Sequence, residues 1–307
     1  MKTTICFTIF SVWALVHCTL LAQSYDHRNR SVDSLEQVLV THPPEGVDLA
    51  TMYNSLMMGY LEIDIEKSML YARKCVAVSI PINEWGHVCD GYYVLGMNHE
   101  RISQFDSAMI YYHKTLENTQ QMNKYPRKYG EVKIDNNYAI VYGAIGNVYN
   151  TQGKYNEAIE YYNKALKVFE KYNAKVNQCI AYNNIGYLYL SMDNWPQAAI
   201  NFSKSDSLAL ILGDSLYIVG TKIHWSRLAL HSKEYAKALQ NAEIAYEYYL
   251  LHSDEEGVRI VEALNLLTEI YLEGYDNVTR AEEYLRKTLE MLAILDIPRE
   301  KAISLRL

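Results

Sequence analysis

Histidines and carboxylates are the residues of this sequence that could support metal or acid–base chemistry. His224 and His231 lie seven residues apart, which on a helix places them on one face, two turns from each other. Two turns are too far apart for both to bind one metal ion without a third ligand. The acidic runs 254–256 and 282–283 read as first turns of helices, where carboxylates stabilise the helix dipole. Both patterns favour structural roles.

Known catalytic motifs are missing from the chain. There is no HExxH zinc motif, no GxSxG nucleophile turn and no glycine-rich phosphate loop. The remaining histidines are scattered, and His99 stands where later segments carry tyrosine, which indicates a packing role. We therefore predict a protein that is not an enzyme and that needs neither a cofactor nor a metal. A hydrolase acting on cell-wall material is the enzymatic alternative.

The composition is that of a folded, tyrosine-rich protein. The chain has 307 residues, of which 50% are hydrophobic and 21% charged, and it contains 28 tyrosines against five phenylalanines. Glycine and proline are scarce, so few tight turns are expected. The formal charge of −7 and the lack of a basic cluster argue against nucleic acid as a partner.

The first 22 residues have the pattern of a secretory signal peptide. Lys2 precedes an apolar run from Ile5 to Ala22, and polar residues resume at Gln23. We predict cleavage after Ala22; the alternative is an uncleaved membrane anchor. No later run is apolar over a membrane's thickness, so the mature chain is expected in the periplasm or associated with the cell envelope, without a membrane span. Its three cysteines are predicted to be small buried residues: Cys75, Cys89 and Cys179.

A sequence motif recurs through most of the chain. An aromatic residue followed three places later by alanine occurs four times, at separations of 50, 40 and 40 residues: Phe105 with Ala108, Tyr155 with Ala158, Trp195 with Ala198, and Tyr235 with Ala238. Weaker copies flank these at 65–75 and 281–288. A second motif with glycine precedes three of the strong copies, at Gly96, Gly146 and Gly186. Such a period is the mark of a repeat protein.

The spacing of these residues predicts pairs of antiparallel helices. Steps of three and four place the motif residues on one helix face, and glycine or alanine there lets a second helix approach closely. A large ring on the facing helix then fills the gap. Gly153 suits the end of a helix. The fifth pair departs from the pattern, because Ser226 stands in the glycine position and Ala229 replaces tyrosine.

This pattern resembles the tetratricopeptide repeat family over about residues 48–294. The resemblance implies an all-α fold, a right-handed α-solenoid of about six antiparallel helix pairs. The 40-residue period exceeds the usual ~34, and the stretch Met122–Asp135, which contains Pro126, lengthens one junction. Residues 23–47 are predicted to form an N-terminal helix and linker. Residues 295–307 are predicted to form a partial helix, either a short cap or a truncated seventh unit.

In this family the first helix of each pair lines a concave groove, and the resemblance carries its inward positions over to named residues here. They are Tyr93 and Met97, Asn147 and Asn150, Asn183 and Tyr187, Arg227, and Asn265 with Glu269. Amide side chains both donate and accept, so a row of them can hold a peptide backbone. Some members of the family bind the C-terminal carboxylate of a partner through lysine or arginine in the groove. Gly143 stands where the third pair would need that lysine. The alternative is that these asparagines cap turns or bond neighbouring helices within the solenoid.

The resemblance thus implies a non-catalytic scaffold that binds a protein or peptide in its groove. More narrowly, the chain resembles the exported sensor region of bacterial signalling regulators, in which the repeats precede a membrane helix and an output domain. We therefore expect the ligand-sensing part of a signal-transduction system. The alternative is a free periplasmic or surface adaptor that assists assembly, as a chaperone does.

Overall fold

The described part of the chain consists of helices in two compact units. A computed structural model describes residues 32–213, 215–252 and 257–294, and the chain divides into the two units between Tyr172 and Asn173. The predicted signal peptide 1–22 and the predicted C-terminal helix 295–307 lie outside the described residues. No strand occurs among the residues described, which confirms the predicted all-α fold.

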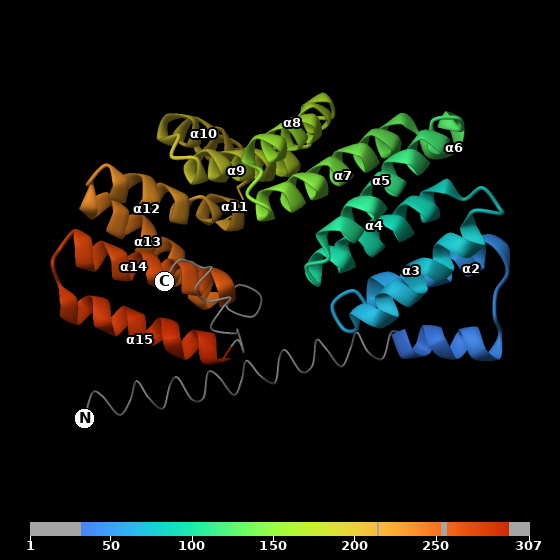
Figure 1. Ribbon diagram of the computed structural model, residues 1–307, viewed down its shortest axis with the longest axis horizontal. Helices are drawn as coiled ribbons and strands as arrows, with labels where there is room; N and C mark the ends of the chain where they lie inside the picture. The colour runs from blue at the N-terminus through green and yellow to red at the C-terminus, as the bar shows by residue number, and fades with distance from the viewer. Residues whose placement is uncertain (1–31, 214, 253–256, 295–307) are drawn as a thin grey trace. The chain divides into compact units, whose positions relative to one another are not determined.

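Unit 1, up to Tyr172, contains three antiparallel helix pairs preceded by a helix at residues 32–41. The pairs are α2 (Gly46–Gly59) with α3 (Ile65–Ser79), α4 (Trp85–Arg101) with α5 (Phe105–Met122), and α7 (Glu131–Thr151) with α8 (Tyr155–Lys171) (Figure 1). The predicted long junction around Pro126 contains a one-turn helix, α6 (Pro126–Tyr129).

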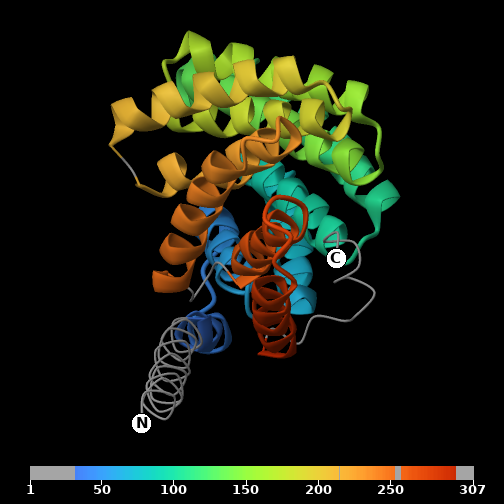
Figure 2. The same ribbon diagram turned by 90° about the vertical axis from the view of Figure 1, so that its left-hand side faces the viewer.

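Unit 2, from Asn173, contains three further pairs, so the expected number of about six is confirmed. They are α9 (Lys175–Ser191) with α10 (Trp195–Leu212), α11 (Ser215–Gly220) and α12 (Lys222–His231) with α13 (Tyr235–Leu251), and α14 (Gly257–Glu273) with α15 (Val278–Ile294). Two views at right angles show α14 and α15 side by side (Figures 1 and 2).

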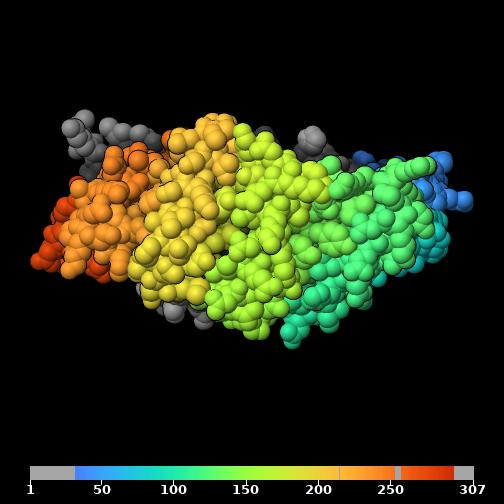
Figure 3. Space-filling view, turned by 90° about the horizontal axis from the view of Figure 1, so that it is seen from above, coloured from blue at the N-terminus to red at the C-terminus, as the bar shows by residue number. Residues whose placement is uncertain are grey.

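Two of the second helices, α8 and α10, lie at the surface of their units. In the space-filling view, the yellow-green residues of α8 and the yellow residues of α10 form much of the visible surface of units 1 and 2 respectively (Figure 3). The motif alanines Ala108, Ala158, Ala198 and Ala238 are fully buried. Burial of Cys75, Cys89 and Cys179 as free thiols confirms the prediction made for the cysteines.

Glycine against an aromatic ring holds three of the helix pairs together. A Cβ atom added to Gly96 would lie 2.5 Å from the ring of Tyr112, so the ring occupies the space that a side chain would need. The same arrangement joins Gly146 to Tyr162 and Gly186 to Phe202. All three rings are almost fully buried. Interiors packed this closely leave no room for one extra carbon atom.

The fifth pair closes the same gap differently. Ser226 is fully buried in α12, and its Oγ donates to the carbonyl oxygen of Ala238 at 2.6 Å. The first helix of the fifth pair is also interrupted, at Thr221 between α11 and α12. The Thr221 hydroxyl donates to the Asp206 carboxylate, and Nε1 of Trp225 donates to Oδ2 of Asp206 at 2.8 Å. The Asp206 carboxylate on α10 therefore accepts hydrogen bonds from two side chains at this interruption.

The turns inside the pairs repeat one backbone conformation. The residue two places before each motif aromatic has a positive φ, at Ser103, Gly153, Asp193 and Lys233, with values between 56° and 71°. This conformation ends the first helix and reverses the chain, as a helix C-cap does. Only one of the four is glycine, so three side chains are held in a conformation that L-residues disfavour.

Candidate functional site

The predicted groove residues of unit 1 pack partly into the core. Tyr93 and Met97 on α4 lie half-buried against a cluster formed by α5 and α7, with the Tyr93 ring centroid 5.9 Å from that of Tyr112. Burial, together with the charge of nearby Glu100, raises the pKa of the Tyr93 hydroxyl to about 12. These side chains present an apolar surface that stays partly accessible.

The two predicted asparagines of α7 differ in their bonding. Asn147 is exposed, and its Oδ1 accepts a hydrogen bond from the Tyr162 hydroxyl at 2.6 Å. This bond links α7 to α8, which is the structural role that the alternative assigned to such residues. Asn150 is half-buried near the end of α7, where its backbone carbonyl oxygen accepts from the backbone N–H of Gly153 at 2.9 Å.

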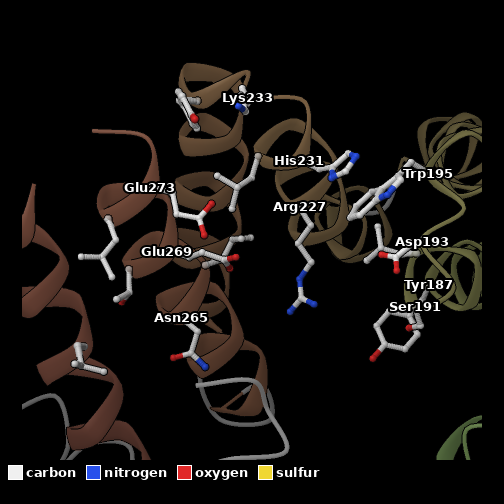
Figure 4. Close-up of a pocket in the computed structure, with 17 residues that line it drawn as sticks. Tyr187, Ser191, Asp193, Trp195, Arg227, His231, Lys233, Asn265, Glu269 and Glu273 are labelled. Atoms are coloured by element: carbon white, nitrogen blue, oxygen red, sulfur yellow. The ribbon is translucent and has the colours of Figure 1, made fainter. Parts of the chain in front are cut away.

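Three predicted groove residues of unit 2 meet at one pocket. Tyr187 on α9, Arg227 on α12 and Asn265 on α14 come from the first helices of three successive pairs, and all three line a cavity of about 660 Å³. Arg227 points between Tyr187 and Asn265 (Figure 4). A cavity of this size suits a short segment of a ligand rather than a single ion.

The Arg227 guanidinium is held by an ion pair across two helices. Its Nη2 lies 2.8 Å from Oε1 of Glu262 on α14, and both side chains are less than one-third exposed. This pair offsets the charge of Arg227 and fixes the orientation of its planar head. Because a guanidinium carries five N–H donors, the remaining donors can serve a ligand.

Asn265 has unsatisfied hydrogen-bonding groups. Its Nδ2 and Oδ1 atoms are buried, and neither bonds to any group in the described residues. Asn183, one turn before Tyr187 on α9, also has a buried Oδ1 without a hydrogen-bond partner among the described residues. A buried polar atom without a partner costs about 1–3 kcal/mol, so such groups in a native protein call for a functional or solvent partner.

Sequence reasoning missed several residues of this pocket. Asp193, Trp195, His231 and Glu273 line it together with the residues predicted. From the sequence, Trp195 was predicted only to pack between helices. In the structure the ring of His231 stacks on it, with centroids 3.8 Å apart and an interplanar angle of 8°. The spacing of Asn265, Glu269 and Glu273, four residues each, marks one face of α14 and was the available signal.

His224 is a neutral packing residue whose ring centroid lies 5.6 Å from that of Tyr187. Burial removes water from its ring, and Arg227 and Arg259 add repulsion, so its pKa falls to about 3. The ring stacks on Phe202, with centroids 4.9 Å apart. His224 is buried while His231 faces the pocket, and the described ranges contain no group of three potential ligands placed to hold a metal ion.

Comparison with protein families identifies one stretch of the chain. A family model described as tetratricopeptide repeat matches residues 137–205, which run from α7 into α10. No curated protein matches the chain in sequence. Within the described ranges, no helix combines the length and apolar character needed to span a membrane.

Several solved structures share the fold at low sequence identity. The apo form of RapI superposes with a TM-score of 0.66 at 19% identity, over 86% of this chain and 89% of that one. A Rap protein complexed with competence and sporulation factor gives 0.64 at 16%, over 94% and 72%. A STAND signal-transduction ATPase with a tetratricopeptide-repeat sensor, from Pyrococcus horikoshii, gives 0.62 at 18%, over 88% and 41%. At these identities the likeness shows the fold alone.

Proposed function

The chain is a helical repeat protein that carries tetratricopeptide repeats, and on that premise we propose that it is a non-catalytic scaffold whose first helices bind a segment of another protein. The observation that carries the proposal is the pocket of unit 2, where the unpartnered amide of Asn265 lies beside Arg227 and Tyr187. An unsatisfied amide that both donates and accepts matches the N–H and C=O groups of a peptide backbone.

Asn265, Arg227 and Tyr187 have complementary roles in this proposal. Asn265 pairs with the backbone of the bound segment, while Arg227 donates to its carbonyl oxygens and stays oriented by Glu262. Tyr187 supplies a rigid ring with a hydroxyl at its tip, a combination favoured at binding surfaces. Within unit 1, the half-buried Tyr93 and Met97 would give a bound segment apolar contacts of the same kind.

A displayed library of random peptides, selected on the full chain, tests this function. We expect a shared sequence to be enriched and Asn265→Leu to weaken binding of the enriched peptides by about tenfold or more, since a bound backbone would lose both of its partners. The same variant should fold with equal or greater stability, because it removes an unsatisfied buried amide. Asn163→Ala on the exposed face of α8 is the control.

Two outcomes would contradict the proposal. One is that no peptide sequence is enriched on the full chain. The other is that Asn265→Leu binds the enriched peptides as tightly as the parent does. Arg227→Lys keeps the charge beside Glu262 but removes the planar fork, so it should weaken the same peptides less than Asn265→Leu does.

We further propose that the bound segment is a signal and that the chain acts in a bacterial envelope after cleavage behind Ala22. The sensor of the STAND ATPase supports this by analogy of fold only. Alkaline phosphatase fused after the chain should be active, and removing residues 2–22 should abolish that activity. Purified exported chain should begin at Gln23. Recovery of the chain in fixed stoichiometry with an envelope complex would instead favour the adaptor role.

A further inference from the structure

A histidine in unit 1 joins the first helices of two neighbouring pairs. His87 on α4 has its Nε2 atom 3.3 Å from Oγ1 of Thr51 and its Nδ1 atom 3.2 Å from Nδ2 of Asn54, both on α2. The same Asn54 nitrogen donates to Oδ2 of Asp90, about one turn further along α4, at 3.0 Å. These four side chains form a polar joint between α2 and α4, which are in contact.

The bonds of the polar joint fix the hydrogen of the His87 ring. The single hydroxyl hydrogen of Thr51 is donated to the backbone carbonyl oxygen of Val47 at 2.9 Å, so Oγ1 of Thr51 has only lone pairs to offer the ring. Nε2 of His87 must therefore carry a hydrogen and donate it. On the other side, the Asp90 carboxylate holds the Asn54 nitrogen as a donor, so Nδ1 must accept. The joint is satisfied by neutral imidazole with its hydrogen on Nε2.

Three ionisable groups surround this histidine. Asp90 lies on the same helix, with Oδ2 3.9 Å from Nδ1 of His87. Lys133 of α7 reaches α4 beside Gly86, where its Nζ lies 3.3 Å from the place of an added Cβ atom. Cys75 of α3 donates to the backbone carbonyl oxygen of His87 at 3.7 Å, and it stays neutral because burial raises its pKa to about 11. Burial also raises the pKa of Asp90, so a nearer cation would stabilise its carboxylate.

The existing bonds cannot accommodate a second hydrogen on the His87 ring. A protonated Nδ1 is a donor, and it would meet the donor nitrogen of Asn54. Either the ring turns towards Asp90, or the Asn54 amide turns over to offer its oxygen and gives up its bond to Asp90. Both rearrangements remove one of the two hydrogen bonds that Asn54 makes from α2 to α4. The first also exchanges a bond between helices for an ion pair within α4.

We propose that the polar joint is a proton switch, in which adding a proton to His87 loosens α2 from α4 and so the first helix pair from the second. Histidine changes its charge near neutral pH, where carboxylates and lysines keep theirs. α4 also carries the half-buried Tyr93 and Met97, so the switch acts on the helix that presents them. The switch is independent of the proposed function, because it needs only the protein and a proton.

Hydrogen exchange of the full chain tests the switch. Exchange at about pH 7.5 and about pH 5.5 is expressed as protection factors, so that the direct effect of pH on the exchange chemistry cancels. We expect the protection of α2 to be about fivefold lower at the acidic pH, which is the effect of losing one hydrogen bond, and the protection of α8 to change less. Nitrogen NMR of His87 should show its hydrogen on Nε2 at the higher pH and a charged ring at the lower.

Three variants assign the effect to the joint. His87→Gln offers Thr51 a donor and Asn54 an acceptor but cannot gain a charge, so the protection of α2 should not depend on pH. His113→Gln replaces an exposed histidine of α5 and should behave as the parent does. Asn54→Leu removes the amide, so the lower protection of α2 should be present at both pH values. Unchanged circular dichroism of each variant shows that it folds.

Three results would overturn the proton switch. The first is equal protection of α2 at both pH values in the parent chain. The second is an acid-dependent loss that persists in His87→Gln, since another group would then be responsible. The third is a neutral His87 ring with its hydrogen on Nδ1. None of these measurements includes a peptide, so the proposed binding function stands or fails separately.

Discussion

The fourth and fifth helix pairs solve one packing problem in opposite ways. In the fourth pair, α9 carries Gly186 and α10 fills the space with the ring of Phe202. In the fifth pair, α12 carries Ser226, and the residue forty places after Phe202 is Ala242, which is also fully buried. Bulk has moved from the second helix to the first. The ring of the fourth pair is replaced in the fifth by smaller side chains and by the hydrogen bond from Ser226 to the carbonyl oxygen of Ala238.

The largest expected effect comes from removing the ring of the fourth pair. Phe202→Ala should lower the free energy of unfolding by about 3–5 kcal/mol, because it leaves a cavity between α9 and α10 and removes the ring under His224. Denaturant titration measures the loss. Adding Gly186→Ser imitates the fifth pair and should return about 1 kcal/mol. A double variant less stable than Phe202→Ala would show that serine at position 186 cannot replace part of the packing that the ring provides.

His224 gives the fifth pair a pH dependence that the fourth lacks, since Asn184 stands forty residues earlier. The unfolded chain protonates this histidine below its ordinary pKa of 6.5, whereas the folded chain does so only near a pKa of about 3. Stability should therefore fall as pH drops from 6.5 towards 3, by up to about 1.4 kcal/mol per pH unit.

His224→Asn removes this titration, so the difference in unfolding free energy between parent and variant should change with pH below 6.5. Titrations of the other groups cancel in that difference. If the difference in unfolding free energy between parent and variant is constant from pH 7 to pH 4, His224 is not held neutral in the folded chain.

Two glycines of α7 provide a smaller and sharper contrast. Gly146→Ala should cost about 1–3 kcal/mol, because its Cβ would lie 2.8 Å from the ring of Tyr162. Gly143→Ala meets nothing within 4 Å and should instead gain up to about 1 kcal/mol, since alanine favours helix. Thermal unfolding of both variants tests the pair. Equal effects would mean that the ring does not fill the space at Gly146.

The smallest expected effect concerns the hydroxyl of the fifth pair. Ser226→Ala should lower the unfolding free energy by about 1 kcal/mol, since it removes the bond to the carbonyl oxygen of Ala238. Denaturant titration is again the measurement. An unchanged stability would show that Ser226 acts through its volume alone.

The repeat fold could be predicted because the residues that indicate it lie close together in the sequence. Glycine, alanine and aromatic residues recur at steps that any helix converts into one face, and the helix pairs follow. The break at Thr221 could not be predicted in the same way. It depends on Asp206, a residue of the previous helix whose sequence position gives no sign that it bonds Thr221 and Trp225.

Part of the candidate site in unit 2 could be predicted in position but not in bonding. Repeat offsets placed Tyr187, Arg227 and Asn265 on one surface, and the pocket contains all three. The same offsets selected Asn147, although a tyrosine from α8 reaches its oxygen. Trp195 was assigned to packing and His231 to a structural role, yet both line the pocket. A residue at the edge of a helix pair can serve the core and the surface together.

The left-handed turn residues have a consequence for how this protein can be altered. Ser103, Asp193 and Lys233 hold a backbone conformation that glycine adopts at Gly153 without strain. Replacing Ser103 by glycine would relax the chain at no expense to the pocket. The same change at Asp193 or Lys233 would relax the chain too, but it would delete a charge that lines the pocket. Thermostability and ligand choice are therefore separable at the first of these turns and coupled at the other two.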